Sequence, residues 1–574
     1  MKKLKFLLLF LLVISQSLLA QNKSVKVEQV ADRYIENLFS FYPEWSTFYG
    51  YSKANNRLLS DISPTGISKQ YKAENKLYKS LLAINNSQLS NDDQITYGIL
   101  QEELESSIGT RVCKKHLWSI HQMDGFHAWF RYVANTQPVG TLKNKNDALA
   151  RWKRLEQYIN QDIENNRKGL NSGFALPEVV IKRVIEQFNL ILKQPVKENM
   201  FYIPATKTDD VKFKQELLSI IETTILPKLS EYKQFLKGEY LPKARKELSI
   251  IAIPNGKECY EASLRQYTTL SDGPQAVFEW GEEAIAIREN KIIEIGKQVY
   301  TKNNLTEIKS AFKADNSNYF ESKDELLDFV NDAVNRADRK KSTYTNLIPA
   351  ANVIVEPISP EEEKSGYSRY LPASDDGSRP ATYIQQTYLP EEQTKGVVES
   401  TAFHETYPGH HHQIAVQREL VKSHAVTKYI GNSGFSEGWA RYTETLSDEI
   451  GLYSSEKNRL AMYMGLPTGM VVDPGIHYKN WTREQAINYT LSKQTSMTRQ
   501  QVERYVDRIS VLPGQMTTYG VGEMYFLKLR ESAKQQYGTK FDIKVFHDNC
   551  LKYGSVPLNF LNTKMDAWLQ SKRE

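Results

Sequence analysis

Four histidines and a glutamate occupy one short stretch of the sequence, HETYPGHHHQ, from His404 to Gln413. A histidine followed by glutamate opens the pattern H-E-x-x-H. In that pattern two histidines one helical turn apart bind zinc, and the glutamate faces the open coordination position. Here Pro408 stands where the second histidine belongs. The stretch is therefore either a zinc site with altered spacing or a histidine-rich segment without that role.

The helical geometry around Pro408 favours altered spacing. Proline inside a helix removes a hydrogen bond and costs about 3 kcal/mol, so we expect the helix that begins near Val397 to bulge or kink there. If the bulge absorbs two residues, His410 becomes the second ligand after His404. His411 is the alternative, but it lies about 10.5 Å further along an unbroken helix, which is awkward for two rings on one zinc. We favour His410 as the ligand and assign His411 to substrate binding or support.

A third zinc ligand is expected downstream, in GFSEGWARYTETL. Glu437 begins an E-x-x-A pattern 27 residues after His410, and in zinc sites of the glutamate type the third ligand comes from a second helix. Two histidines, one glutamate and an open position for water make a hydrolytic zinc site. Glu444 lies two turns further along the same helix, where it could orient a ligating histidine.

Five segments together resemble a known family: HETYPGHHHQ, DDGSRPATYI, FSEGWARYTETL, VVDPGIHYKNWTREQAINY and PGQMTTYGVGEMYFLKLRE. They are similar to a bacterial domain of unknown function whose exported or lipoprotein members are zincin-like and carry an H-E-x-x-P-G-H motif. The motif-level resemblance runs from about Tyr370 to Phe560. It implies metallopeptidase activity and a fold similar to the helical gluzincins, such as the carboxypeptidases and oligopeptidases with a deep substrate channel.

The chemistry expected of such a site is peptide hydrolysis. Zinc lowers the pKa of its bound water towards 7, and Glu405 takes the proton and passes it to the leaving amine. The developing oxyanion needs another donor. His477, after a tight Asp-Pro-Gly turn, and Tyr519, where a helix should begin, are candidates, although a residue of either kind taken alone more often serves in the core or a turn. Gln515 could donate a hydrogen bond to the substrate.

Substrate binding calls for groups that hold an extended peptide. Residues 381–389, ATYIQQTYL, are expected to form an edge strand that pairs with peptide backbone. Arg379 could bind a terminal carboxylate, or form a salt bridge with Asp375 or Asp376 that stabilises a turn. Arg504 is a candidate of the same kind.

The sequence thus predicts an exported zinc metallopeptidase. The alternatives are a zinc hydrolase of a non-peptide amide or ester, and a metal-binding pseudoenzyme that acts as a binding protein. Glu405 disfavours a purely structural metal, because a structural site needs no base and is normally closed by four protein ligands. The choice between exo and endo cleavage and the oligomeric state stay open.

Elements that must position these residues are mainly helical. Apolar residues recur at three- and four-residue spacing through most of the chain, for example in PEVVIKRVIEQFNLIL. Two runs, ANVIVEPIS and ATYIQQTYL, are strand-like and precede the histidine stretch. We therefore expect a mainly α fold with one small sheet beside the zinc helix. The expected parts are a signal peptide (1–20), a helical N-terminal part (21–345) and a catalytic part (346–574).

The N-terminus and composition indicate export. MKKLKFLLLFLLVISQSLLA has the basic start, short apolar run and small residues of a signal peptide, and no cysteine follows it to carry a lipid. We expect a periplasmic or secreted protein without a transmembrane segment. The net charge of +6, half of it from the leader lysines, does not indicate nucleic-acid binding. The three cysteines, Cys113, Cys259 and Cys550, allow at most one disulfide.

Overall fold

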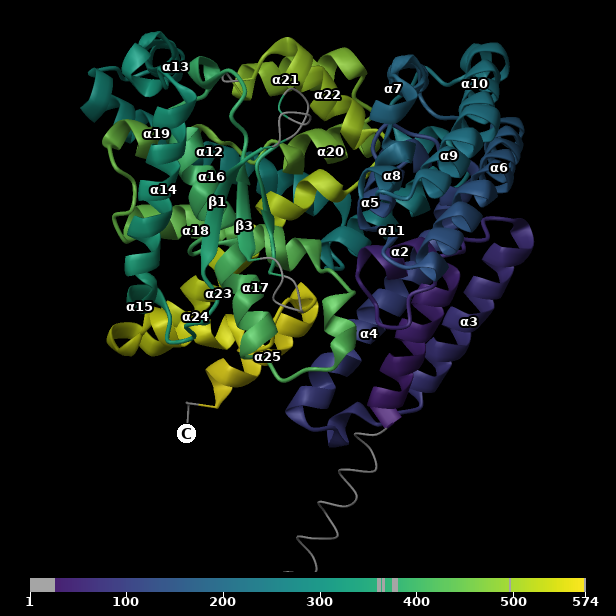
Figure 1. Ribbon diagram of the computed structural model, residues 1–574. Coiled ribbons are helices and arrows are strands. Elements are labelled where there is room, and N and C mark those ends of the chain that lie inside the picture. Colours follow the sequence, from purple (N-terminus) through teal and green to yellow (C-terminus); the bar gives the residue numbers. More distant parts are fainter. Residues whose placement is uncertain (1–25, 359–362, 364–366, 374–379, 495–496, 572–574) are drawn as a thin grey trace, which may run out of the picture. The chain divides into compact units, whose positions relative to one another are not determined.

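A computed structural model describes residues 26–358, 363, 367–373, 380–494 and 497–571 of the protein (Figure 1). These residues are mainly helical and include one three-stranded sheet. The predicted fold class, mainly α with a small sheet, is therefore confirmed.

Two compact units make up the chain. The first comprises the residues up to Ala262 together with Arg504–Pro513, and the second comprises Ser263–Glu503 together with Gly514–Glu574. The boundary expected at residue 345 falls inside the second unit. About eighty residues of helix that precede the sheet thus belong to the same unit as the histidine stretch.

The described residues of the first unit form helices joined by loops. Its longest helix, α6, is capped by the Thr141 side chain, which accepts a hydrogen bond from the Asn144 N–H. One face of α6 buries Trp152, Leu155 and Ile159 at three- and four-residue spacing, as an amphipathic helix should. The unit's helices are residues 26–41, α2 (Pro43–Phe48), α3 (Pro64–Leu82), α4 (Asn91–Thr110), α5 (Phe126–Thr136), α6 (Leu142–Asn171), α7 (Glu178–Lys193), α8 (Ile203–Thr206), α9 (Val211–Ile220), α10 (Leu226–Phe235) and the start of α11 (Gly256–Thr268).

Two long-range links close this unit. Cys113 and Cys259 form a disulfide, and Cys550 is a buried free thiol in the second unit. Arg183 pairs with the fully buried Asp507 at 2.5 Å, which ties the late segment Arg504–Pro513 to α7. A buried charge of this kind is stable only when paired.

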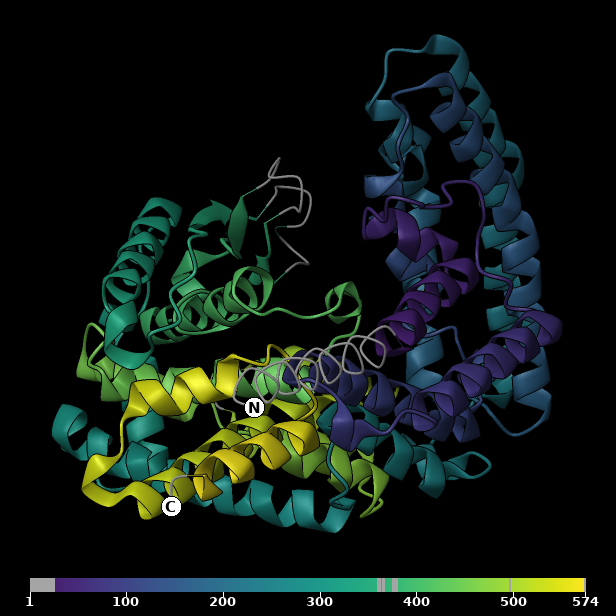
Figure 2. The ribbon, with the colours of Figure 1, turned by 90° about the horizontal axis from the view of Figure 1, so that it is seen from below.

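The second unit places helices around the sheet. Figure 2 shows the sheet and α14 as the upper layer of this unit, with the C-terminal helices α23–α25 beneath them. Its elements are the end of α11, α12 (Pro274–Tyr300), α13 (Leu305–Ala314), α14 (Lys323–Arg339), α15 (Lys341–Tyr344), β1 (Val353–Pro357), β2 (Arg369–Leu371), β3 (Ala381–Gln385), α16 (Lys395–Glu405), α17 (His410–Glu419), α18 (Ser433–Glu449), α19 (Glu456–Met464), α20 (Gly469–His477), α21 (Arg483–Lys493), the start of α22 (Arg499–Ile509), α23 (Thr518–Tyr537), α24 (Ile543–Leu551) and α25 (Leu558–Gln570).

The sheet has the order β1-β3-β2. β3 pairs in parallel with β1, with Val353 opposite Ala381, and antiparallel with β2, with Tyr370 opposite Tyr383. Our prediction that residues 381–389 form an edge strand is therefore wrong, because β3 is the central strand and ends at Gln385. Its burial explains this: four of its five residues are buried, as a strand with neighbours on both sides requires.

One core cluster joins the sheet to α16. Tyr383 of β3 packs with Val398, Ala402 and Phe403 of α16 and with Val330 of α14. This cluster fixes the last turn of α16, which carries His404 and Glu405, against the sheet.

Helices α18 and α23 are in unusually close contact. A Cβ on Gly438 would lie 2.3 Å from the Gly522 Cα, and one on Gly522 would lie 2.5 Å from the Gly438 Cα. Only glycine at both positions allows this approach. The contact sets the position of Glu437, the residue before Gly438.

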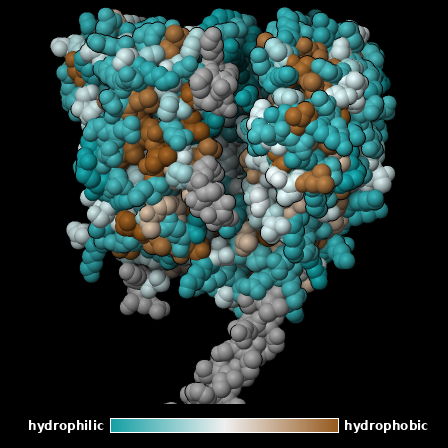
Figure 3. All heavy atoms as spheres, in the orientation of Figure 1, coloured by the Kyte–Doolittle hydropathy of each residue, from teal (hydrophilic) through white to brown (hydrophobic). Residues whose placement is uncertain are grey.

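Among the described helices, none is long and apolar enough to cross a membrane. The face seen in Figure 3 is largely hydrophilic, with separate hydrophobic patches.

Candidate metal centre

The helix that carries His404 ends abruptly. α16 ends at Glu405 and α17 begins at His410, so Pro408 lies in a complete break rather than in the bulge we expected. Across the break, the Gly409 N–H donates to the Phe403 carbonyl at 3.1 Å. A Cβ on Gly409 would lie only 1.9 Å from the His404 carbonyl oxygen. Glycine at 409 is thus a steric requirement of this corner.

The break also has a contact with α18. The Trp439 indole N–H donates to the Pro408 carbonyl at 3.0 Å, and Trp439 is fully buried. Because Trp439 lies two residues after Glu437, this bond ties the corner between the two histidines to the helix that carries the glutamate.

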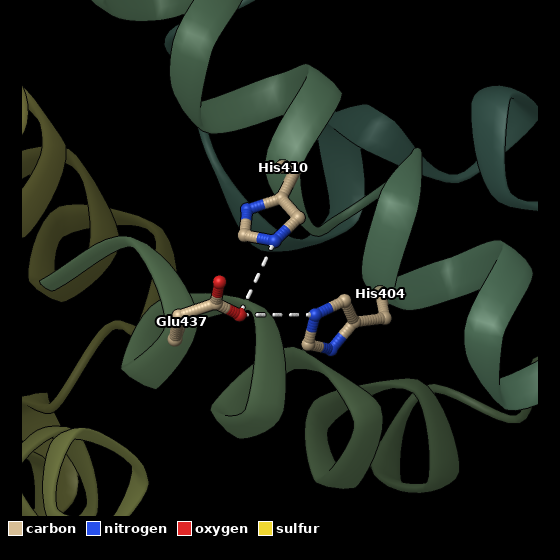
Figure 4. Close-up of side chains that lie close together, drawn as sticks. All are labelled: His404, His410 and Glu437. Atoms are coloured by element: carbon tan, nitrogen blue, oxygen red, sulfur yellow. Dashed lines mark ion pairs between the residues drawn. The ribbon is translucent and has the colours of Figure 1, made fainter. Parts of the chain in front are cut away.

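His404, His410 and Glu437 converge from three helices, α16, α17 and α18 (Figure 4). Their potential ligand atoms all lie within 4.8 Å of one another. The Glu437 Oε2 is 3.5 Å from Nε2 of His404 and 3.6 Å from Nε2 of His410. The structure thus groups His410, rather than His411, with His404 and Glu437.

This donor set fits a zinc ion. Tetrahedral zinc with bonds near 2.1 Å places neighbouring ligand atoms roughly 3.4 Å apart, close to the two distances to Glu437. The two imidazole rings are nearly perpendicular, with centroids 4.8 Å apart. The Glu437 side chain is 25% exposed, so water can reach the centre. Three protein ligands with access for water are the arrangement of hydrolytic zinc sites.

Glu444 fixes the orientation of His404. Its Oε1 accepts a hydrogen bond from Nδ1 of His404 at 2.9 Å, which leaves Nε2 directed at the centre. Glu444 is itself held by Arg441, at 2.6 Å, and by the Ser400 hydroxyl, at 3.0 Å. A carboxylate that holds a ligating histidine in this way fixes its tautomer and increases its basicity.

Electrostatics of the centre favour a cation. Burial alone would raise the pKa of Glu437, but hydrogen bonds from His404 and His410 lower it well below its usual range. Burial would likewise raise the pKa of Glu444, but Arg441 and His404 lower it to about 2. Burial would lower the pKa of His404, yet hydrogen bonds with the two carboxylates raise it to about 10. The carboxylates therefore stay ionised and attract positive charge to this point.

Glu405 lies beside the centre in a different environment. Burial raises its pKa, although His404 and His410 oppose the shift. A raised pKa is what a carboxylate needs to act as a base near neutral pH. Its Oε2 accepts a hydrogen bond from the backbone N–H of Tyr370 in β2, at 3.0 Å.

His411 is fully buried and engaged at both nitrogens. Its Nε2 lies 3.1 Å from the Ala351 carbonyl oxygen and 3.0 Å from the Tyr407 hydroxyl, and its Nδ1 lies 3.1 Å from the Tyr370 hydroxyl. Burial lowers its pKa to about 4, so the ring is neutral. Because a carbonyl only accepts, Nε2 carries the proton and Nδ1 accepts from Tyr370. His411 therefore supports β2 instead of facing the centre.

Comparison with family models identifies the chain. The model described as "Bacterial protein of unknown function (DUF885)" matches residues 43–565. The chain belongs to the DUF885 family. None of the curated proteins matched it.

Two solved structures share the fold of this DUF885 protein. One is described as "the putative lipoprotein from Colwellia psychrerythraea", with a TM-score of 0.85 and 23% identity over 95% of this chain and 100% of that one. The other is "a putative lipoprotein of unknown function from Shewanella oneidensis", with a TM-score of 0.77 and 18% identity over 94% and 99% of the two chains. At these identities the likeness establishes the fold.

The predicted oxyanion donors lie on neighbouring helices of the DUF885 chain. His477 is fully buried at the end of α20, and Tyr519 is half-buried in the first turn of α23. The contact of Gly438 with Gly522 places α23 beside the helix of Glu437. Their catalytic roles, and that of Gln515 just before α23, stay predictions.

The expected Asp-Pro-Gly turn before His477 is wrong, because residues 473–475 lie inside α20. Tertiary contacts account for the helical conformation. The Asp473 carboxylate accepts the Gly514 N–H at 3.0 Å with each oxygen. The Trp481 ring packs closely against Gly475: a Cβ on Gly475 would lie 2.6 Å from the nearest ring atom.

The substrate-binding roles expected of Arg379 and Arg504 stay predictions. Arg379 lies outside the described residues. Arg504 is exposed on α22 and belongs to the first unit, whereas the three candidate ligands belong to the second.

Sequence reasoning missed Arg441, Trp439 and Tyr370. The spacing of Arg441 and Glu444, three residues apart on one helix, could have suggested their ion pair. Trp439 and Tyr370 act through contacts with distant segments, for which the local sequence carries no signal.

Proposed function

We propose that this protein is a zinc-dependent metallopeptidase in which His404, His410 and Glu437 bind the metal and Glu405 is the general base. The observation that carries this proposal is the convergence of three donor atoms beside a carboxylate with a raised pKa. A structural metal site would have no use for that carboxylate. We further propose that the protein acts outside the cytoplasm, which its disulfide between Cys113 and Cys259 favours.

The metal would act as a Lewis acid on a substrate carbonyl and make a nearby water more acidic. The residues of the chain do the remaining work. Glu405 is adjacent to His404 and accepts the proton of the attacking water. It then delivers that proton to the leaving nitrogen, so that the amine departs neutral. Glu444 accepts a hydrogen bond from Nδ1 of His404 and keeps the proton on that atom. The Nε2 of His404 therefore stays available to bind the metal.

The test is mass spectrometry of a mixed peptide library incubated with zinc-loaded protein, beside the chelated protein and the Glu405→Gln variant. We expect cleavage by the loaded protein alone. The loss in the variant should reach at least 10²-fold, the lower end of general-base contributions. The variant should retain stoichiometric zinc, because Glu405 is not among the three ligands.

Three results would overturn the proposal. Cleavage that survives chelation would exclude metal catalysis, and full activity of Glu405→Gln would exclude Glu405 as the general base. Zinc bound without any peptide cleavage would favour a non-peptide amide or ester substrate or a binding protein. The product ends would also distinguish exo from endo action.

A further inference from the structure

Tyr370 is held at two places by the segment that carries the candidate site. Its backbone N–H donates to Oε2 of Glu405 at 3.0 Å, and its hydroxyl donates to Nδ1 of His411 at 3.1 Å. Glu405 and His411 lie on opposite sides of the break between α16 and α17. Tyr370 therefore bridges the end of one helix and the start of the next.

His411 is well placed to be a fixed support. It is fully buried, and its second nitrogen is anchored to the Ala351 carbonyl and the Tyr407 hydroxyl. The Tyr370 and Tyr407 rings both pack edge-on to its ring, with centroids 5.4 and 4.8 Å away. The ring can rotate only by breaking contacts on both sides.

β2 needs such a support. It has only three residues, pairs on one side with β3, and lies at the edge of the sheet. So short an edge strand gains little stability from its own ladder. The bond between Tyr370 and His411 supplies a side-chain anchor at the middle residue of the strand.

We propose that His411 and Tyr370 are positioning residues for Glu405: His411 fixes Tyr370 through its hydroxyl, and the Tyr370 N–H holds one carboxylate oxygen of the base. The inference rests on the proposed role of Glu405. Holding Oε2 restricts rotation of the carboxylate and leaves Oε1 to meet the water. A base held in one orientation avoids an entropic cost at each turnover, and a misplacement of about 1 Å at such a group can cost about 10²-fold in rate.

The three adjacent histidines thus have different roles. His410 directs its Nε2 to the metal centre, whereas His411 supports β2. His412 is buried, with Nδ1 3.3 Å from the Tyr344 hydroxyl, and belongs to the core. A substitution at His411 should therefore leave zinc binding intact, unlike one at His410.

Two substitutions of His411 separate its contacts. Asparagine places its side-chain oxygen near the position of Nδ1, so His411→Asn keeps an acceptor for Tyr370. Glutamine reaches the position of Nε2, so His411→Gln keeps the donor to Ala351 and loses the contact with Tyr370. Tyr370→Phe removes the same bond from the other side. Tyr319→Phe is the matched control, because it also removes one tyrosine hydroxyl, bonded at 3.1 Å to the Lys313 carbonyl in the same unit.

The measurements are zinc stoichiometry, kcat and KM, and hydrogen exchange at the Tyr370 amide in the zinc-loaded proteins. In Tyr370→Phe and His411→Gln we expect full zinc, kcat lowered about 10- to 100-fold with KM nearly unchanged, and amide exchange at least about 10-fold faster. His411→Asn should lie close to the wild type in all three, and Tyr319→Phe should equal it.

Hydrogen exchange at the Tyr370 amide also tests the positioning contact if the proposed function fails. Were the wild type to cleave no peptide, the proposed function would fall, and faster exchange in Glu405→Ala and His411→Gln would still support the positioning contact. Unchanged exchange and turnover in Tyr370→Phe and His411→Gln would overturn it. Loss of zinc in His411→Gln would also overturn it, because His411 would then be a ligand.

Discussion

Replacing Gly438 with alanine should damage both the fold and the metal centre. The new Cβ would lie 2.3 Å from the Gly522 Cα, whereas ordinary contact begins at 3.4 Å. Because the obstacle is backbone, α18 and α23 must separate by about 1 Å. Overpacking of this kind costs about 1–3 kcal/mol.

The same displacement would reach the proposed metal centre. Glu437 precedes Gly438, and a zinc ligand tolerates errors of only about 0.2 Å in its bond length. A shift near 1 Å should therefore weaken zinc binding by at least about 10-fold, or roughly 1.4 kcal/mol. We expect Gly438→Ala to unfold at lower temperature and to bind zinc more weakly.

The assays are thermal unfolding followed by circular dichroism and zinc titration against a chromophoric chelator. Gly109→Ala is the matched control. Gly109 is also helical, in α4, and its Cβ would meet nothing within 4 Å, so alanine there should stabilise by about 0.5–1 kcal/mol through helix propensity. Alanine is the better helix former at both sites, so a loss of stability in Gly438→Ala beside a gain in Gly109→Ala isolates the packing effect. Wild-type stability and zinc affinity in Gly438→Ala would refute the reasoning.

Three further predictions address other parts of the molecule. Glu444→Gln should bind zinc about 10- to 100-fold more weakly with the fold intact, and unchanged affinity in a chelator competition would show that its bond to His404 is incidental. Burial lowers the pKa of His127 to about 4; the unfolded chain takes up this proton below pH 6.5 and the folded chain does not. The free energy of unfolding should thus fall by up to roughly 3 kcal/mol as the pH is lowered from 6.5 to 4. Denaturant titrations at several pH values should show a smaller fall in His127→Gln. Reducing the bond between Cys113 and Cys259, which closes a separation of 146 residues, should cost about 2–4 kcal/mol. Calorimetry with and without reductant tests this, and Cys113→Ser should abolish the effect of the reductant.

Much of the local structure could be predicted from the sequence because it depends on neighbouring residues. Three- and four-residue periodicity predicts the amphipathic helices. A serine followed three residues later by glutamate, as at Ser322 and Glu325, is typical of a helix start, and α14 begins there, where the Ser322 hydroxyl accepts the Glu325 N–H at 3.1 Å. The two strand-like runs became β1 and β3. The short β2 carried too few residues for a signal, and it lies between segments that are rich in turn-forming residues.

Strand order could not be predicted, since it depends on which partners bury each strand. ATYIQ is typical of a strand in isolation, but its central position follows from pairing with both β1 and β2, and its Tyr383 is buried with Val398 and Phe403 of α16. The complete helix break at Pro408 has a similar origin. Proline alone predicts a distortion, whereas the hydrogen bond from Trp439 and the close approach of Gly409 to His404 select this particular corner.

The sequence by itself determined the candidate chemistry of this protein: residue types that bind zinc, a carboxylate beside them, and amphipathic helices that could carry them. Tertiary structure alone decided which histidine joins His404 and Glu437, what His411 supports, and that the Tyr370 N–H contacts Glu405. The physical reason is the separation along the chain over which each kind of interaction acts. Residue chemistry and helical periodicity are set within a few positions of the chain. Contacts between distant segments are set by the packing of the whole unit, where a shift of about 1 Å in one helix changes which donor atoms meet.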